Sequence, residues 1–410
     1  MVQRASSVLF YAFFISLPDH RAVKHVLSLI LVALSGESAA VAAVPSSPAR
    51  MQHVRFAACG WKADSSASVE SGSLNAIAAD SSSDVWAVGS LASSSQLTSK
   101  ALFEHFDGTR WQSGLAVTVP NTETVLTGAS ALAANDVWAV GTFNQPEIQF
   151  GAITEHWNGK AWSLIQPVAP VQPGDPNFFA FTAVVAVASN DVWAVGYSHT
   201  GTRPGTLSLA EHWDGTQWSI IPTPNVGNPP HGGFGGVAAG GTNDVWAVGS
   251  AAGPPLSEHW DGKQWTVVPM PSPLGSPVAV DLKGATEIAS NDVWAVGTVN
   301  GLAAITYHWD GRTWKIISSP NVQGARNGLV AVSHFSSSDV WAAGSVQGSD
   351  TRTLVEHWNG AAWSIQTTPN PSSPNRQIDD TLAGILALAP QNVIAVGRAF
   401  PTSLVEEFCR

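Results

Sequence analysis

The stretch DVWAVG at Asp191–Gly196 occurs almost unchanged in six copies along the chain, and as NVIAVG in a seventh. The copies begin at Asp84, Asp136, Asp191, Asp244, Asp292, Asp339 and Asn392. Their spacing of roughly 50 residues lies in the range of propeller and solenoid repeats. The sequence therefore predicts one small structural unit that is repeated along the chain.

Each unit contains four segments with the composition and alternation of β-strands. In the third unit these are Phe181–Val187, Asp191–Tyr197, Leu207–Trp213 and Gln217–Ile221. Four antiparallel strands in each of seven units predict an all-β fold, a seven-bladed β-propeller of four-stranded blades.

The turns distinguish the two faces of this propeller. A short turn such as 188–190 joins the first and second strands, and Asp214-Gly215, a strong hairpin signal, joins the third and fourth. Both tight turns fall on one face, so the two long and variable connections fall on the other. We expect a binding site on this variable face.

The two ends of the repeat predict how the ring closes. The seventh unit stops after its third strand, Leu404–Phe408, whereas Gly60-Trp61 ahead of the first unit matches the tryptophan of a fourth strand. We therefore expect residues 54–63 to supply the missing strand. The chain has two cysteines, Cys59 and Cys409, and they flank this junction. A disulfide is predicted, with two free thiols as the alternative.

The first 45 residues lie outside the repeat and resemble a secretory leader. Arg21–His25 are cationic, Val26–Leu34 form an apolar run, and Ser38–Ala43 supply small residues. We expect a signal peptide within 1–45 and a propeller over 46–410, with repeats from 74 to 410. A retained membrane anchor is the alternative. The prediction is a secreted or cell-surface monomer without membrane insertion after cleavage.

Charge and composition limit the partners. The net charge is −11, and only 12% of the residues are charged. Without a basic patch, nucleic acid and anionic membranes are disfavoured. No EF-hand spacing is present. No cofactor and no metal are therefore predicted, although calcium in the channel stays open.

The segment EHWDGTQW at Glu211–Trp218 resembles a shortened Asp-box, with Asp before Gly and a following Trp. The whole unit resembles the DVWAVG/HWDG repeat of secreted bacterial propellers, which are grouped with the kelch and galactose-oxidase type. This resemblance implies the fold and says little about activity, because propellers host unrelated functions.

Tyrosine is scarce for the enzymes of these families. The copper site of galactose oxidase needs two tyrosines, and this chain has three in all, with Tyr11 in the leader. A sialidase-like site needs a nucleophilic tyrosine. Tyr307 replaces the repeat glutamate within a strand, so only Tyr197 remains on a loop. Neither kind of site is expected.

Most conspicuous side chains occupy repeat positions. All 18 tryptophans do so, which predicts packing between blades rather than sugar stacking. The pair Glu211-His212 likewise recurs in five units, and a catalytic dyad is not needed five times. We interpret the repeated Glu and His as partners in buried hydrogen bonds. Zinc is not expected, because successive histidines are a blade apart.

Binding residues are therefore sought among the differences between units. The connections on the variable face contain polar and aromatic side chains suited to a glycan or a peptide, although solvated loops without a site are the alternative. The candidates are Asn144, Glu147, Asp175, Asn177, Phe178, Phe179, His199, Arg203, His231, Lys283, Arg326, Arg352, Arg376 and Asp380.

The innermost strand contains one further departure. Five units have alanine where the fifth and sixth have Glu287 and His334. These two could form an ion pair near the channel and act as acid and base. A hydrogen-bonded plug is the alternative, and Lys283 could instead neutralise Glu287.

We expect a non-enzymatic binding or scaffold protein that recognises an extracellular glycan or protein through its variable face. The alternative is a hydrolase or lyase that acts on polysaccharide in the channel with Glu287 and His334. A purely structural surface module would differ in lacking a saturable ligand.

Overall fold

The computed structural model describes residues 59–64, 69–92, 99–116, 122–145, 149–170, 177–200, 205–224, 226–227, 231–273, 278–371 and 379–409. The chain divides into two units, Met1–Arg55 and Phe56–Arg410. The predicted signal peptide and residues 54–58 of the predicted closing strand lie outside the described residues. No helix that could cross a membrane occurs among the residues described.

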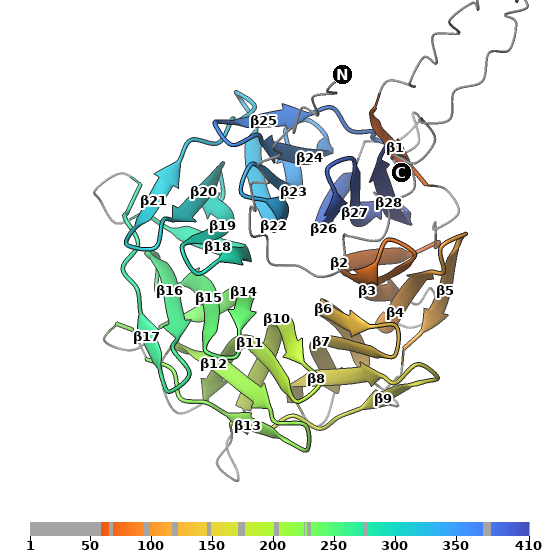
Figure 1. Cartoon of the computed structure of the whole chain (residues 1–410). Helices are drawn as coiled ribbons and strands as arrows, with labels where there is room; N and C mark the ends of the chain where they lie inside the picture. The colour runs from red at the N-terminus through yellow and green to blue at the C-terminus, as the bar shows by residue number, and fades with distance from the viewer. Residues whose placement is uncertain are drawn as a thin grey trace, which may run out of the picture. The chain divides into compact units, whose positions relative to one another are not determined.

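Within Phe56–Arg410 the strands form seven four-stranded antiparallel sheets that follow one another around a ring (Figure 1). The first strand of each blade lies innermost and the fourth outermost. The predicted seven-bladed propeller is confirmed. Successive blades are numbered 1 to 7 from the N-terminus.

The strands of blades 1 to 4 have the following bounds: β2 (Gly72–Ser81), β3 (Asp84–Ala92), β4 (Ser99–Phe106), β5 (Trp111–Leu115); β6 (Glu123–Ala133), β7 (Asp136–Gln145), β8 (Gln149–Trp157), β9 (Trp162–Leu164); β10 (Asn177–Ala188), β11 (Asp191–Thr200), β12 (Thr206–Trp213), β13 (Trp218–Ile220); β14 (Gly233–Gly241), β15 (Asp244–Ser250), β16 (Pro255–Trp260), β17 (Trp265–Val267).

Blades 5 to 7 follow the same order, and the N-terminal strand belongs to the last of them: β18 (Val280–Ala289), β19 (Asp292–Val299), β20 (Ala303–Trp309), β21 (Trp314–Ile317); β22 (Arg326–Ser336), β23 (Asp339–Gln347), β24 (Thr351–Trp358), β25 (Trp363–Gln366); β26 (Asp380–Ala389), β27 (Asn392–Ala399), β28 (Thr402–Phe408), β1 (Trp61–Ala63).

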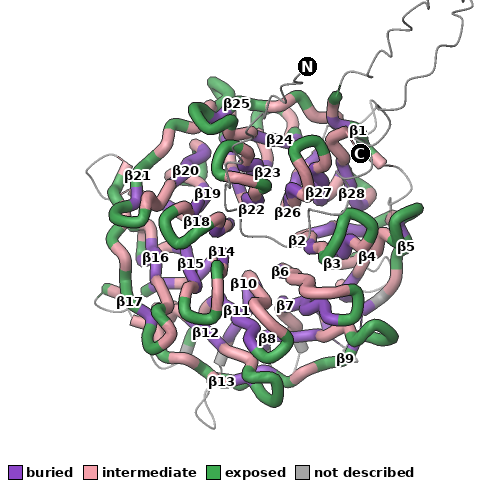
Figure 2. Tube along the Cα trace, viewed as in Figure 1, coloured by how far each residue is buried: buried purple, intermediate pink, exposed green. Residues whose placement is uncertain are grey.

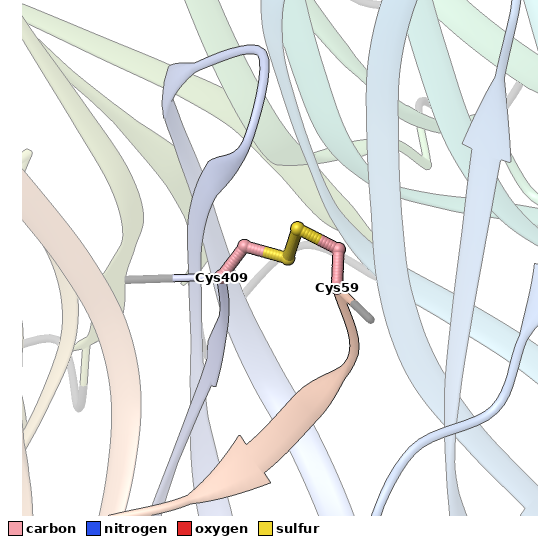
Figure 3. The surroundings of a disulfide bond; sticks show 2 residues. All are labelled: Cys59 and Cys409. Carbon is pink, nitrogen blue, oxygen red and sulfur yellow. A yellow bond between two sulfur atoms is a disulfide. The ribbon is translucent and has the colours of Figure 1, made fainter. Parts of the chain in front are cut away.

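The ring closes as the sequence predicts. Strand β1 pairs antiparallel with β28, and Trp61 lies opposite Phe408. Beside this pair, Cys59 and Cys409 form a disulfide with their Cα atoms 5.2 Å apart (Figure 3). The bond joins positions 350 residues apart. It ties the N-terminal strand to the C-terminal end of the same blade, so the predicted disulfide is confirmed.

A β-bulge in every first strand explains the glycine of DVWAVG. The register between first and second strands shifts at the same place in all seven blades, for example between Phe181 and Ala183. Opposite this bulge, a Cβ on Gly196 would collide with the carbonyl oxygen of Ala180. The glycine therefore allows the bulge, and the bulge turns one residue of each first strand toward the channel.

The DVW tryptophans join each blade to the next. Trp138 of blade 2 lies 5.3 Å from Trp213 and 5.5 Å from Trp218 of blade 3, measured between ring centroids. The contact with the fourth-strand tryptophan is edge-to-face, at 85–88° between ring planes in five of these junctions. At the sixth junction Trp341 contacts Trp61 and Phe408. The predicted packing between blades is thus confirmed.

The last junction, from blade 7 to blade 1, differs. Ile394 replaces the tryptophan there and packs in one apolar cluster with Trp111 of blade 1. Buried residues concentrate within the blades, whereas exposed residues gather in the turns and outer edges (Figure 2). The seam at which the chain ends meet is therefore next to a junction that has lost its large ring.

Replacing Cys59 and Cys409 by serine should lower the free energy of unfolding by roughly 2–5 kcal/mol, because the bond restricts the unfolded chain over almost its whole length. Urea unfolding followed by tryptophan fluorescence measures this loss. A reducing agent should destabilise the wild type and leave the double variant unchanged. Equal stability of the oxidised and reduced wild type would contradict the expected effect.

Candidate functional site

The first strands of all seven blades surround a narrow channel. A cavity of about 160 Å³ within the channel is lined by the bulged residues and their neighbours, and a deeper one of about 300 Å³ is lined by residues nearer the tight turns. In blades 1 to 3 the bulged side chain bonds the next blade. Asn75 Nδ2 donates to Leu126 O (2.8 Å), and Thr127 and Thr182 donate to the carbonyls of Phe181 and Phe234 (2.9 Å each).

Blade 4 breaks this pattern with a glycine at the bulge. A Cβ on Gly235 would collide with the carbonyl oxygen of Leu282 in blade 5. Strands β14 and β18 therefore approach more closely than a side chain at residue 235 would allow. The bulged residue of blade 5 is Lys283, the only charged residue among the seven bulged positions.

A cavity of about 590 Å³ opens on the variable face over blades 3 to 5. We call it the variable-face hollow. It lies where the connections between second and third strands meet the starts of the first strands. Its lining includes Tyr197, Thr206, His231, Ser250, Asp281 and Lys283.

The glycine-rich segment HGGFGG at residues 231–236 forms the floor of the hollow. At the positions of Gly233 and Gly235, blade 5 has Asp281 and Lys283. A Cβ on Gly233 would lie 3.2 Å from the Cβ of Tyr197, which is a tight approach. The hollow therefore exists because the first strand of blade 4 carries no side chains there.

Tyr197 forms one wall and begins an aromatic row that extends beyond the lining of the hollow. The Tyr197 ring lies 5.6 Å from that of Phe178, and Phe178 lies 4.7 Å from Phe150, again between centroids. Phe150 is 38% exposed, and Phe178 and Tyr197 are half-buried. The row combines apolar ring faces with the polar hydroxyl of Tyr197.

An ion pair lies on the opposite side of the hollow. Lys283 Nζ is 2.9 Å from Asp281 Oδ2, and the two side chains are 47% and 50% exposed. His231 is exposed between these walls, and its Nδ1 accepts the backbone N–H of Thr206 at 3.0 Å. In the neutral ring the proton is then on Nε2, which is available as a donor. The hollow thus offers donors, an acceptor and an aromatic face.

Among the sequence candidates, His231 and Lys283 line this hollow, and Phe178 supports Tyr197.

Other candidates do not line the hollow and contact residues elsewhere. Asn144 Nδ2 donates to Glu123 Oε2 (3.5 Å), His199 Nδ1 bonds Gly205 O (2.8 Å), and Arg352 lies 3.6 Å from Asp350. Arg326 is exposed at the start of β22.

Two candidates require correction. Phe179 is 7% exposed and Asp380 is fully buried, so neither lies on an accessible loop. The physical reason is that β10 and β26 begin at or before these residues and extend the sheet toward the variable face. Glu147, Asp175, Arg203 and Arg376 lie outside the described residues, as does the side chain of Asn177.

Glu287 and His334 do not form the ion pair that their shared repeat position makes possible. Both line the deeper channel cavity, but His334 Nδ1 lies 2.7 Å from Thr286 Oγ1. Glu287 is buried beside Asp244 of blade 4, and Lys283 pairs with Asp281 rather than with Glu287. Burial lowers the pKa of His334. Burial and then the nearby Asp244 carboxylate raise the pKa of Glu287.

Gly240 makes room for Glu287. A Cβ on Gly240 would lie 2.5 Å from Glu287 Oε1, whereas the other first strands have larger residues at this position. Asp244, beside Glu287, bonds His259 Nε2 through Oδ1 at 2.7 Å. Two departures from the repeat in adjacent blades therefore fit each other. They build a carboxyl pair between blades rather than an acid and a base facing a substrate.

Gly240→Ala should lower the free energy of unfolding by about 1–3 kcal/mol, because the added methyl group overlaps the Glu287 carboxyl. Gly241→Ala is the matched control, since a Cβ there meets open space. The cost of Gly240→Ala should shrink in a Glu287→Ala background. Chemical denaturation of the four variants measures this, and equal effects of the two glycine substitutions would contradict the fit.

The repeated histidines have a structural role. In six blades an oxygen of the DVW aspartate lies 2.6–2.9 Å from Nε2 of the repeated histidine, in hydrogen-bond contact. The histidine ring also packs on the DVW tryptophan, as His105 does on Trp86 with centroids 4.0 Å apart. These contacts support the interpretation of the repeated histidine as scaffold.

Three of the repeated glutamates bond the preceding blade or the connection that leaves it. Ser403 Oγ donates to Glu104 Oε1 (2.8 Å), the N–H of Val168 donates to Glu211 (2.9 Å), and Ser319 Oγ donates to Glu356 (2.8 Å). These glutamates are fully buried, and burial raises their pKa values to about 7–8. Tyr307 takes the same place in blade 5 and donates to Pro271 O (3.1 Å).

The fully buried Glu258 provides a test by pH. Burial raises its pKa from 4.5 to about 8, so the folded state binds this proton more tightly than the unfolded state does. Its stabilising contribution is present below about pH 4.5 and is lost as the pH rises through about 8. Glu258→Gln should therefore flatten the fall in stability between pH 5 and pH 9, by roughly 2–4 kcal/mol.

Urea unfolding at several pH values measures this slope. The exposed Glu70 provides the control, because Glu70→Gln should leave the slope as in the wild type. A wild type whose stability rises from pH 5 to pH 9, or a Glu258→Gln slope equal to that of the wild type, would contradict the burial effect.

Sequence reasoning missed part of the hollow. From the sequence alone, Tyr197 is a candidate only for an enzymatic nucleophile, and Ser250 and Asp281 are not candidates. The run of glycines in HGGFGG was a usable signal, because a first strand without side chains leaves space. In the part of the chain that the structure describes, no group of three or more His, Cys, Asp or Glu is placed to hold a metal ion.

Solved structures share the propeller fold at low identity. YCF48 bound to a D1 peptide is similar with a TM-score of 0.53 and 14% identity, over 85% of this chain and 97% of that chain. YCF48 from Cyanidioschyzon merolae is similar with a TM-score of 0.51 and 16% identity, over 85% of this chain and 98% of that chain. The SapL1 lectin in complex with alpha methyl fucoside is similar with a lower TM-score of 0.47 and 16% identity, over 74% of this chain and 98% of that chain.

No protein-family model matches the sequence, and no curated protein matches it. At these identities the similar structures show the fold alone. The resemblance to DVWAVG/HWDG, kelch and Asp-box repeats stays a prediction from the motifs. The comparisons thus place the chain among β-propellers.

Proposed function

We propose that this protein is a secreted, non-enzymatic binding propeller that recognises an extracellular glycan or protein at the variable-face hollow. The observation that carries the proposal is the hollow itself, about 590 Å³ between an aromatic wall and an accessible ion pair. Ligand sites of proteins are usually concave, of about 300–1,000 Å³, with a few convergent polar groups. The hollow has these properties and results from departures from the repeat.

Secretion is supported by the disulfide, because such bonds persist in oxidising compartments. The predicted signal peptide within residues 1–45 agrees with it. Membership of the secreted bacterial propellers with DVWAVG/HWDG repeats is part of the same proposal, as is a monomer without cofactor. The YCF48 structure with a D1 peptide is a precedent for a peptide bound to a propeller.

The channel enzyme is the less supported alternative. An acid and a base must both reach the reacting atoms of one substrate. His334 instead bonds Thr286 in the neighbouring blade, and Glu287 is buried beside Asp244. No observation in the channel favours turnover over this structural use of the two side chains.

Ala279→Trp should abolish binding at the hollow, because Ala279 is exposed on its rim and an indole would fill the space. Arrays of glycans and of peptides, probed with the purified protein, provide the measurement. Ala361→Trp, in an exposed tight turn on the other face, should bind like the wild type. A wild type that binds nothing saturably, or a ligand that Ala279→Trp does not displace, would overturn the proposal.

A further inference from the structure

The charges of the variable-face hollow compensate each other. Lys283 and Asp281 are 2.9 Å apart and about half exposed, so both reach the cavity while they neutralise each other. A charged ligand would have to separate this pair or oppose one of its members. The net charge of −11 adds repulsion for anionic ligands. The hollow therefore favours a polar ligand without charge.

Tyr197 and the ion pair of Lys283 with Asp281 together suit a ligand ring that has one apolar face and polar edges. Tyr197 presents a ring whose position is supported by Phe178 and Phe150. Aromatic side chains bind apolar faces while their polar atoms remain hydrated. The C–H face of a pyranose sugar is such a surface, and its edge consists of hydroxyl groups.

The polar groups also match neighbouring hydroxyls. The Asp281 carboxylate accepts hydrogen bonds and the Lys283 ammonium donates them, so two adjacent hydroxyls can bond to the pair without breaking it. Hydrogen bonds to charged groups are stronger than those between neutral groups. His231 Nε2–H adds a donor that is fixed by the bond from Thr206 to Nδ1. A volume of about 590 Å³ admits a short oligosaccharide.

From this geometry we infer that the variable-face hollow binds a neutral sugar unit, stacked on Tyr197 and held through its hydroxyls by Asp281 and Lys283. The inference rests on the proposed function and names the ligand class of the same site. The hollow should therefore bind neutral glycans in preference to uronic-acid glycans and peptides.

The test measures binding of three sets of probes to the purified protein: neutral gluco-, manno-, xylo- and fuco-oligosaccharides, oligogalacturonates, and a peptide array. We expect saturable binding of a neutral oligosaccharide and none of the oligogalacturonates. Tyr197→Ala should weaken this binding at least about tenfold, whereas Tyr197→Phe keeps the ring and should stay within about threefold. Lys283→Met and Asp281→Asn should each weaken it about tenfold.

The control is Lys315→Met, which removes another exposed ion pair, Lys315 with Asp310 at 2.7 Å, far from the lining of the hollow. It should bind as the wild type does. Binding of peptides or oligogalacturonates alone, blocked by Ala279→Trp, would overturn the sugar inference and leave the proposed function standing. Sugar binding that survives both Tyr197→Ala and Ala279→Trp would overturn the site and with it the inference.

Discussion

The structure depends on the contact between the DVW tryptophan of one blade and the two aromatic rings of the next. Six blades carry this tryptophan, and each needs the following blade to cover it: Trp138 packs on His156 of its own blade but on Trp213 and Trp218 of the next. Each large ring contributes burial and edge-to-face packing only when its neighbour is present. Stability therefore requires a closed ring, and the strand β1 and the Cys59–Cys409 bond provide the closure.

The same repetition explains how much the sequence can predict. A feature that recurs seven times, such as the Trp of DVW or the Asp-Gly turn, identifies its role by its period, and the fold and ring closure follow from it. The ends of strands do not recur. Strand β10 begins at Asn177 rather than at Phe181, so Phe179 became a buried strand residue instead of a loop candidate. The strand propensity of a segment does not show where its strand begins when the paired strand extends the sheet further.

Contacts between blades are harder to predict still. Glu287 and His334 occupy one repeat position in adjacent blades, which suggests a possible ion pair, but each side chain instead reaches toward the blade that precedes its own. Glu287 lies against Gly240 and Asp244 of the preceding blade, and His334 bonds Thr286 of its own preceding blade. The role of the glycines of HGGFGG is equally hard to predict, because they form the hollow by lacking side chains.

Function, on this account, belongs to the places where the repeat is interrupted, and the interruptions of blades 3 to 5 converge on the variable face. The most direct measurement is hydrogen exchange by mass spectrometry of the purified protein with and without the oligosaccharide that it binds most tightly. We expect slowed exchange at residues 197–200, 205–206, 231–235, 250–253 and 279–283. Slowed exchange confined to the tight-turn face, or to the channel around Glu287 and His334, would contradict it.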